Sequence, residues 1–364
     1  MAKIRVLIVD DSSLIRQLLS MLLSSDPEIE VVGAAPDPYV ARDMIKSLNP
    51  DVVTLDVEMP RMDGLSFLRK IMALHPLPVV MVSTLTQANA DVTIQALEIG
   101  AVDFVAKPTS QLDKGMETLA SQLQAKIKEA ARTKVYARPE TVQEEQKPVS
   151  RPKSLGPTDK IVFVGASTGG VEALLKLLQG FPEDCPPILI TQHMPERFTS
   201  SFAARLNTVC AMTVIEAAND QPVQQGHVYI APGSHHLEIV RKLNRYVCQL
   251  NLDAPVSGHR PSVDVLFGSA ARVVGRKAVG AILTGMGKDG AQGLLEMRQA
   301  GAVTLGQDEK SSLIYGMPRA AFERGAVMKQ VALDRMAASI LSACGGGAGA
   351  QDAAAEAGRK TLSR

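Results

Sequence analysis

The sequence has few cysteines, almost no excess charge and no long apolar run. Its four cysteines, Cys185, Cys210, Cys248 and Cys344, form no CxxC pair, which argues against a zinc site or a disulfide framework and favours reduced thiols. A net charge of +1 gives no electrostatic argument for binding nucleic acid or a membrane surface. No uncharged apolar run approaches the ~20 residues of a membrane span, and the N-terminus lacks the length and cleavage site of a signal peptide. We therefore expect a cytoplasmic protein that binds no nucleic acid and does not insert into a membrane.

The chain has 364 residues, enough for two domains of ordinary size, and 46% of them are hydrophobic, as in proteins that bury a core. In residues 1–130, short apolar runs alternate with segments of helical period, which predicts strands and helices in turn. The predicted strands cover residues 4–9, 30–34, 52–56, 78–83 and 102–106. This alternation predicts a doubly wound α/β domain with a five-stranded parallel, flavodoxin-like sheet.

Polar side chains stand at the carboxyl ends of these strands, where doubly wound folds bind ligands. They are Asp10, Asp11, Asp56, Ser83 and Lys107. Three carboxylates at one place repel each other unless a cation lies between them, and hard oxygen ligands suit Mg²⁺. The pattern indicates a metal-assisted phosphoryl acceptor with one carboxylate as nucleophile. The alternative is that these acids are only solvated caps of the strands.

This region closely resembles the receiver domain of two-component response regulators. The matching stretches are VDDS at 9–12, LDVEMPRMDG at 55–64, MVS at 81–83 and FVAKP at 104–108. The resemblance implies that Asp56 takes a phosphoryl group from a histidine kinase. It also implies that Mg²⁺ is held by Asp10, Asp11, Asp56 and the carbonyl of Val57.

The same resemblance assigns roles near the last two strands of the region. Ser83 and Lys107 would contact the phosphoryl group, and Phe104 matches the switch aromatic of the family. The Lys107–Pro108 bond would be cis, which costs an X–Pro peptide only about 0.5–1 kcal/mol.

Two segments lack the periodicity of a folded domain. Residues 131–158 carry prolines among Glu, Gln, Lys and Arg, a composition that cannot bury a core, and we predict a flexible linker there. Its excess of basic residues leaves a partner-binding patch as an alternative. The Gly- and Ala-rich residues 344–364 are predicted to be a disordered tail.

Residues 159–343 again alternate apolar runs with helical segments, which predicts a second and larger α/β domain with a mostly parallel, Rossmann-like sheet. The predicted strands cover residues 161–165, 187–192, 212–216, 226–230, 278–283 and 303–305, with a hairpin formed by 237–240 and 246–251.

Ser167, His193 and Asp289 each follow one of these apolar runs. The carboxyl ends of parallel strands share one edge of a sheet, so the three side chains can meet there. A serine needs a base to become a nucleophile, and a histidine needs an acid to fix its tautomer and stabilise the imidazolium. Residues 165–169 also fit the pattern G-x-S-x-G, which is short and therefore weak evidence.

Spacing alone leaves alternatives open. The glycine-flanked turn at Ser167 is also suited to capping a helix or cradling a phosphate. His235, His236 and His259 are competing candidates for the base, and Asp264 is a competing acid.

Several stretches of the second region resemble the chemotaxis protein-glutamate methylesterase family, CheB. They are GASTGG at 165–170, QHMP at 192–195, APG at 231–233, HRPSVDVLF at 259–267, LTGMG at 283–287, DG at 289–290 and YGMP at 315–318. The resemblance implies a triad of Ser167, His193 and Asp289. Thr168 and Met286 fall where the family builds the rest of its site, and we expect their backbone N–H groups to bind the oxyanion.

The resemblance further implies hydrolysis of glutamate γ-methyl esters on methylated chemoreceptors, with release of methanol, and deamidation of receptor glutamines by the same acyl-transfer chemistry. It implies no cofactor for the esterase and a receiver that blocks the site until Asp56 is phosphorylated.

Two other classes of protein are weaker alternatives. A nucleotide- or cofactor-binding domain would place an acid at the end of its second strand, where this chain has Gln192 and His193. A DNA-binding response regulator would need a small basic helix-turn-helix domain, and the second region is larger and rich in strands.

Overall fold

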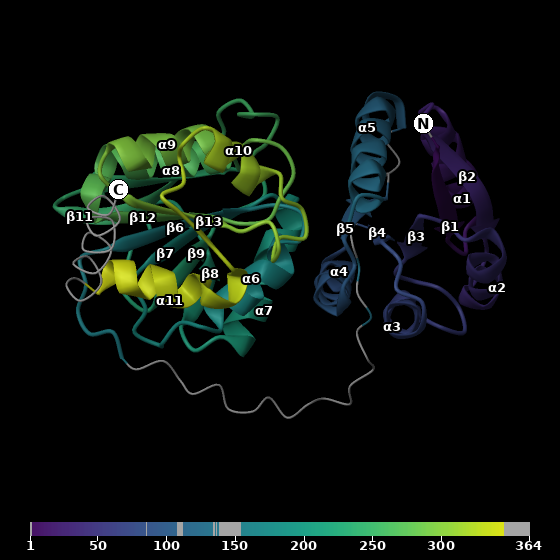
Figure 1. The fold of residues 1–364 in the computed structure, drawn as a ribbon, viewed down its shortest axis with the longest axis horizontal. Helices are drawn as coiled ribbons and strands as arrows, with labels where there is room; N and C mark the ends of the chain where they lie inside the picture. Colours follow the sequence, from purple (N-terminus) through teal and green to yellow (C-terminus); the bar gives the residue numbers. More distant parts are fainter. Residues whose placement is uncertain are drawn as a thin grey trace, which may run out of the picture. The chain divides into compact units, whose positions relative to one another are not determined.

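A computed structural model of the chain describes residues 2–84, 86–107, 112–133, 135, 137 and 154–345. The chain divides into two compact units, residues 1–147 and 148–364 (Figure 1). In the described parts of both units, no helix is long and apolar enough to cross a membrane. Pro108 and therefore the predicted cis bond, most of the predicted linker, and the predicted tail from residue 346 onward lie outside the described residues.

The described residues of the first unit form five strands and five helices in alternation. The strands are β1 (Ile4–Val9), β2 (Ile29–Ala35), β3 (Val52–Asp56), β4 (Val79–Ser83) and β5 (Asp103–Ala106). The helices are α1 (Ser13–Ser24), α2 (Pro38–Leu48), α3 (Gly64–Leu74), α4 (Gln87–Ile99) and α5 (Leu112–Ala130). All neighbouring strands pair in parallel in the order β2-β1-β3-β4-β5. The predicted flavodoxin-like fold is confirmed.

The order of strands in this sheet creates a binding crevice. Strand β2 pairs with one edge of β1, and the chain then returns to form β3 along the other edge of β1. The connections leave in opposite directions there, so the carboxyl ends of β1 and β3 face an open crevice between them. Strands β3 and β4 are buried along their whole length, as in parallel sheets covered by helices on both faces.

The second unit is built on a seven-stranded sheet. Its strands are β6 (Ile161–Ala166), β7 (Ile188–Gln192), β8 (Thr213–Glu216), β9 (His227–Ile230), β12 (Ala278–Ile282), β13 (Val303–Gln307) and β14 (Lys329–Val331). They pair in parallel in the order β14-β13-β12-β6-β7-β9-β8. The predicted Rossmann-like sheet is therefore confirmed, and a separate antiparallel hairpin joins β10 (His236–Lys242) to β11 (Arg245–Asn251).

The helices of the second unit surround this sheet (Figure 1). They are α6 (Gly170–Leu178), α7 (Glu196–Val209), α8 (Val263–Val273), the short 3₁₀ helix η1 (Gly275–Lys277), α9 (Ala291–Gln299), α10 (Met317–Glu323) and α11 (Leu333–Cys344).

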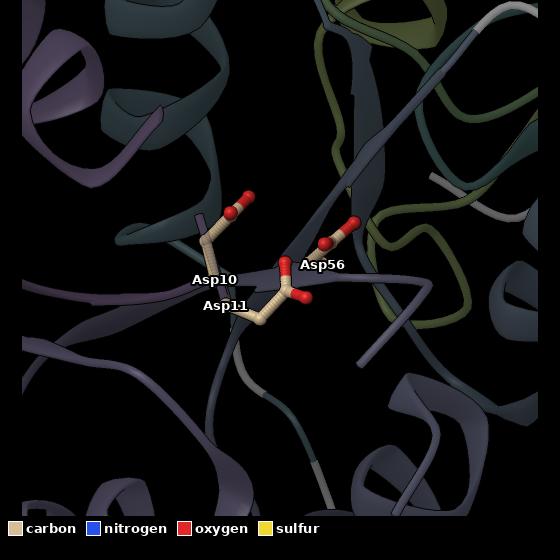
Figure 2. Close-up of side chains that lie close together, drawn as sticks. All are labelled: Asp10, Asp11 and Asp56. Carbon is tan, nitrogen blue, oxygen red and sulfur yellow. The ribbon is translucent and has the colours of Figure 1, made fainter. Parts of the chain in front are cut away.

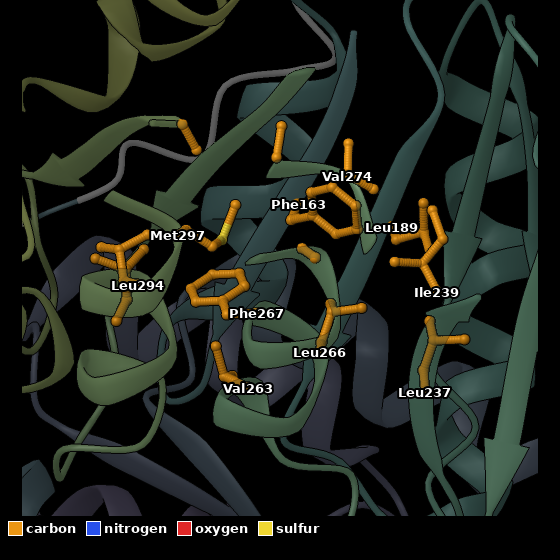
Figure 3. Close-up of a cluster of buried hydrophobic side chains, with 14 of the residues drawn as sticks. Phe163, Leu189, Leu237, Ile239, Val263, Leu266, Phe267, Val274, Leu294 and Met297 are labelled. Carbon is orange, nitrogen blue, oxygen red and sulfur yellow. The ribbon is translucent and has the colours of Figure 1, made fainter. Parts of the chain in front are cut away.

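A buried apolar cluster holds α8 in place. Figure 3 shows Phe163 of β6 and Leu189 of β7 beside Leu266 and Phe267 of α8, with Ile239 of the hairpin close by. All five side chains are fully buried, and each contributes roughly 1.5–3 kcal/mol relative to an exposed position. The cluster therefore fixes the start of α8 next to the sheet edge where β6 ends.

Two elements at the end of the second unit were not predicted, β14 and α11. The apolar residues of α11 recur with helical spacing at Leu333, Met336, Ala337 and Ile340, and all are buried. The helix ends at Cys344, one residue beyond the predicted domain boundary.

The last residues of the predicted linker contact the second unit. The carboxylate of Asp184 accepts hydrogen bonds from the N–H groups of Leu155 and Gly156 at 3.2 and 3.0 Å and from the hydroxyl of Ser154. The Gln225 side chain also donates to the Gly156 carbonyl at 2.7 Å. Residues 154–156 of the predicted linker are therefore held by hydrogen bonds to the second unit. The predicted domain boundaries otherwise stay a prediction.

Candidate functional sites

An acidic cluster lies at the carboxyl edge of the first sheet. Asp10 and Asp11 follow β1, and Asp56 is the last residue of β3 (Figure 2). One carboxylate oxygen from each lies within 4.8 Å of the others. Asp10 and Asp56 are only 0% and 3% exposed, whereas Asp11 is exposed. The crevice thus gathers three carboxylates, two of them buried.

Lys107 bridges the two buried acids. Its Nζ lies 2.9 Å from Asp10 Oδ2 and 2.8 Å from Asp56 Oδ2. Burial, with a smaller contribution from the charge of Asp10, raises the pKa of Asp56 to about 6 in spite of Lys107. Burial alone would lower the pKa of Lys107, but its bonds to the two carboxylates outweigh burial and raise it. One lysine therefore neutralises this cluster only in part.

The atoms around the cluster suit a small hard cation. The Val57 carbonyl accepts the N–H of Gly64 at 3.0 Å, which leaves its second lone pair for another partner. With the three carboxylates, the donor set consists of oxygen atoms only, as Mg²⁺ prefers. Ser83 is buried at the end of β4, and its hydroxyl donates to the Thr84 carbonyl at 3.3 Å.

A second set of polar side chains follows three adjacent strands of the second sheet. Ser167 follows β6, His193 follows β7 and Asp289 lies in the loop after β12. The N–H of Ser167 donates to the Thr284 carbonyl at 3.0 Å, and the N–H of His193 donates to the Ala166 carbonyl at 3.1 Å. The predicted residues are therefore gathered at the carboxyl edge where the order of strands reverses around β6.

Asp289 and His193 are hydrogen-bonded. The distance from His193 Nε2 to Asp289 Oδ2 is 2.8 Å, and Asp289 is 1% exposed. The carboxylate also accepts the N–H groups of Val263 and Asp264 at 2.7 and 3.0 Å and the hydroxyl of Ser262 at 2.8 Å. Burial alone would raise the pKa of Asp289, but His193 and the two backbone donors lower it to about 2. Asp289 is therefore a charged partner of the imidazole ring at neutral pH.

The other ring nitrogen of His193 is free to accept a proton. Nδ1 is buried and has no hydrogen-bond partner among the described residues. The neighbouring Gln192 amide donates to the carbonyls of both Ser167 and His193, at 2.9 and 3.2 Å. This single side chain therefore ties together the two turns that carry the serine and the histidine.

The space for the Gln192 side chain depends on Gly170. A Cβ atom on Gly170 would lie 2.0 Å from Gln192 Oε1, closer than atoms can approach. Gly170 is also the first residue of α6, and its N–H donates to the carbonyl of Ser167 at 2.7 Å.

Thr168 and Met286, the predicted oxyanion donors, stand on two sides of the Ser167 turn. Thr168 is buried, and its carbonyl accepts the hydroxyl of Thr284 at 3.0 Å. Met286 follows Thr284 and Gly285 on the loop that receives the Ser167 N–H, and its side chain is 46% exposed. Among the described residues, no hydrogen bond uses the N–H of Met286.

The competing histidines have other surroundings. The ring of His259 stacks on that of His193, with centroids 3.8 Å apart and 8° between the planes. His236 is fully buried, and its Nδ1 accepts the N–H of Ser262 at 3.1 Å. His235 Nδ1 lies 2.9 Å from the hydroxyl of Ser234.

Asp264, the competing acid, lies in the first turn of α8. Its carboxylate accepts the N–H of Gly293 in the first turn of α9 at 2.8 Å. Burial, together with the nearby charge of Asp289, raises the pKa of Asp264. Asp264 on α8 therefore caps the start of α9, and Asp289, just before α9, caps the start of α8. The hydrogen bond to His193 is made by Asp289.

Comparison with known proteins places the chain in a family. The family model described as CheB methylesterase matches residues 162–340, and that of the response regulator receiver domain matches residues 6–119. A protein-glutamate methylesterase/protein-glutamine glutaminase 1 from Caulobacter vibrioides is 58% identical, and one from Dechloromonas aromatica is 56% identical; each match covers 94% of this chain and 98% of the relative. The chain belongs to the CheB methylesterase family.

The fold of this CheB-family chain also matches a solved structure. The crystal structure of the CheB methylesterase catalytic domain from Thermotoga maritima has a TM-score of 0.50 and 33% identity, and covers 50% of this chain and 97% of that one. The resemblance to a receiver joined to a methylesterase is thereby confirmed.

Two residues that hold Ser167, His193 and Asp289 in place could not be assigned that role from the sequence. Ser262 and Gln192 stand out in the sequence only as members of matching stretches, yet both bond directly to the candidate catalytic residues or their backbone. Ser262 carried one signal, because a serine directly before an apolar helical run is a typical N-cap. That signal predicts its bond to the Val265 N–H, observed at 3.4 Å, but not its bond to Asp289.

Proposed function

We propose that this chain is a phosphorylation-regulated protein-glutamate methylesterase that hydrolyses glutamate γ-methyl esters on chemoreceptors and deamidates receptor glutamines. The observation that carries the proposal is the His193–Asp289 hydrogen bond at the sheet edge that also presents Ser167. The printed names of the relatives, protein-glutamate methylesterase/protein-glutamine glutaminase, support the same activity.

In the proposed reaction, Ser167 Oγ attacks the ester carbonyl carbon while His193 Nδ1 accepts the hydroxyl proton. Asp289, through Nε2, holds the ring and balances the charge of the imidazolium. The N–H groups of Thr168 and Met286 would stabilise the tetrahedral oxyanion. Collapse breaks the bond to the methoxy group, which takes the proton from His193 and leaves as methanol.

The second half of the reaction restores the enzyme. Water attacks the glutamyl-Ser167 ester and gives one proton to His193 Nδ1. That proton returns to Ser167 Oγ as the bond to Oγ breaks, and the product leaves as a carboxylic acid, which loses its proton to water. With a glutamine substrate, ammonia replaces methanol as the leaving group and every other step is the same. No cofactor is needed for these steps.

In the first unit, Asp56 would accept a phosphoryl group from a histidine kinase. Asp10, Asp11, Asp56 and the Val57 carbonyl would hold Mg²⁺, which when bound offsets the charge of the phosphoryl oxygens. Lys107 and Ser83 would contact the phosphoryl group. The receiver at 1–130 and the esterase at 159–343, joined by the linker at 131–158, would then act as switch and enzyme.

Methanol release from methylated chemoreceptors in membranes tests the activity. We expect the full chain to release methanol and to be labelled by a fluorophosphonate, and Ser167→Ala to do neither. Ser200→Ala is the control, since among the described residues its hydroxyl on α7 bonds only the Arg197 carbonyl, at 3.4 Å. Methanol release by Ser167→Ala at the wild-type rate would disprove the triad.

A phosphodonor tests the regulation. We expect a small-molecule phosphodonor with Mg²⁺ to raise methanol release by the wild-type chain and to leave Asp56→Asn at its basal rate. A chain that begins at residue 154 should be as active as the phosphorylated full chain. If that shortened chain were no more active than the unphosphorylated full chain, the receiver would not block the esterase.

A further inference from the structure

The donors around Asp289 come mainly from one place in the fold. Besides His193, its carboxylate is bonded by the hydroxyl of Ser262 and by the N–H groups of Val263 and Asp264, all at the start of α8. Oδ1 receives Ser262 and Asp264, and Oδ2 receives Val263 and His193. These four donors match the roughly four acceptor positions of a carboxylate.

The hydrogen bonds of Ser262 define the direction in which its hydroxyl donates. Ser262 is fully buried, and its Oγ accepts the N–H of Val265 at 3.4 Å as the N-cap of α8. The hydroxyl proton is then available for Asp289 Oδ1 at 2.8 Å, because a charged carboxylate can only accept. The backbone N–H of Ser262 is held separately, by His236 Nδ1 at 3.1 Å. The backbone of Ser262 is thus held by His236, and its hydroxyl donates to Asp289.

We propose that Ser262 is a positioning residue for the triad: its hydroxyl fixes the Asp289 carboxylate so that Oδ2 faces His193 Nε2. A carboxylate can rotate about its Cβ–Cγ bond, and a bond to Oδ1 from a helix N-terminus that is packed into the core opposes this rotation. His193 is then held with Nδ1 directed away from Asp289, which is the nitrogen that would serve Ser167. The inference rests on the proposed esterase function.

The groups that can titrate near this bond are few in the described structure. His193 faces Asp289 from the end of β7, and the ring of His259 stacks on that of His193. Asp264 faces Asp289 from the first turn of α8, and His236 of β10 contacts Ser262. Removal of the Ser262 hydroxyl takes one donor from the charged carboxylate and makes protonation of the His193–Asp289 pair easier. The acid limb of the pH profile should therefore move to higher pH.

The variants Ser262→Ala, Ser262→Gly and Ser262→Thr separate positioning from helix capping. Alanine loses the cap and the donor, glycine is almost neutral as an N-cap but has no donor, and threonine keeps both. Ser269→Ala is the matched control. Ser269 is also buried on α8, accepts the Ile239 N–H at 3.0 Å and donates to the Leu266 carbonyl at 2.7 Å, away from the triad.

Steady-state methanol release by the full chain supplies the first test. We expect kcat to fall roughly tenfold in the alanine and glycine variants, with KM unchanged and the acid limb moved to higher pH. Threonine should restore kcat. The control Ser269→Ala should lower the melting temperature as Ser262→Ala does, with kcat and the pH profile unchanged. Wild-type kcat and pH profile in Ser262→Gly would overturn the positioning role.

A second test does not need the esterase to be active. In the full chain at low pH, the imidazole N–H proton bonded to Asp289 should give a downfield proton resonance in NMR spectra. We expect Ser262→Ala and Ser262→Gly to shift it and Ser269→Ala to leave it in place. If the wild-type chain released no methanol, the proposed function would fail while this resonance still tested Ser262. An unchanged resonance in both Ser262 variants would contradict the proposal.

Discussion

Asp56 in the first unit and Asp289 in the second are both buried aspartates at the carboxyl edge of a parallel sheet, and their surroundings are opposite. Asp56 faces two other carboxylates and one lysine, and burial raises its pKa to about 6. Asp289 receives hydrogen bonds from His193 and from three groups at the start of α8, and its pKa is lowered to about 2. Asp56 thus keeps its proton up to a much higher pH than Asp289, which is charged at neutral pH.

The difference between the two pKa values follows from the number of hydrogen-bond donors around each carboxylate. Few protein donors surround Asp56, so its charge is best satisfied by something from outside, a cation or a proton, and its oxygen remains available for chemistry. Asp289 has no acceptor position left, so it can only orient and stabilise what it already holds. A buried acid without enough donors is therefore a candidate for binding or reaction, and a saturated one for positioning.

The substitution Asp289→Asn replaces a charged carboxylate, which only accepts hydrogen bonds, by a neutral amide that also donates. We expect it to have the largest effect. The new NH₂ group must face a donor, either an N–H of α8 or His193, and the ring loses the charge that stabilises its protonated form. We expect kcat for methanol release to fall about 10⁴-fold, as for the equivalent change in serine protease triads. Fluorophosphonate labelling of Ser167 should slow in parallel. A loss of less than about tenfold would show that the charge of Asp289 is unimportant.

Two glycines allow the comparison to be tested at matched positions, since Gly64 and Gly170 are the first residues of α3 and α6. A Cβ on Gly64 would lie 2.1 Å from the backbone carbonyl of Asp56, whereas one on Gly170 would meet the Gln192 side chain. The Gln192 side chain can move away from a new Cβ atom more easily than the backbone carbonyl of Asp56 can. We expect Gly64→Ala to lower the free energy of unfolding of the first unit by about 3 kcal/mol, and Gly170→Ala that of the second by about 1 kcal/mol.

Urea unfolding followed by circular dichroism measures both changes. Gly170→Ala should also lower kcat, because the displaced Gln192 amide holds the carbonyls of Ser167 and His193. Gly64→Ala should leave basal esterase activity unchanged and weaken Mg²⁺ binding. A larger loss of stability for Gly170→Ala than for Gly64→Ala would contradict the role given to the two contacts.

Magnesium binding should reveal the raised pKa of Asp56. A proton and a cation compete for the same carboxylate, so Mg²⁺ binds the deprotonated form only. Because the pKa is about 6, the affinity should be constant at higher pH and fall about tenfold for each pH unit below it. Calorimetric titration of the full chain with MgCl₂ at pH values on both sides of this pKa measures the effect, with Asp56→Asn as the control. A pH-independent affinity would mean that Asp56 is not a ligand.

Much of the fold could be predicted from the local pattern of apolar residues, because a buried parallel strand has the sequence of a short apolar run with polar residues at its ends. That pattern by itself places Asp10, Asp56 and Ser167 at sheet edges. It failed for β14, which has three residues and too little sequence for a signal. It should have found α11, whose apolar residues have the period of a helix.

The sequence could place the candidate residues at the ends of strands, but it could not predict the contacts that hold them. Strand ends bring Ser167, His193 and Asp289 to one edge, but the choice among four histidines depends on distances that periodicity does not contain. The support of Asp289 comes from the start of α8, which is placed there by the packing of Phe267 and Leu266 on the sheet. Packing between distant segments is the part that a local pattern cannot encode.

Ser12→Ala should have the smallest effect and sharpens the comparison of the two units. Like Ser262, Ser12 caps a helix beside an acidic site, and its hydroxyl accepts the Ile15 N–H at 3.4 Å. The contact of Ser12 with Asp10 uses its backbone N–H, at 2.9 Å, which alanine retains. We expect a loss of about 1 kcal/mol in urea unfolding of the first unit and unchanged Mg²⁺ affinity, because only the cap is lost. Weaker Mg²⁺ binding in Ser12→Ala would show that a serine hydroxyl supports the acids of both sites.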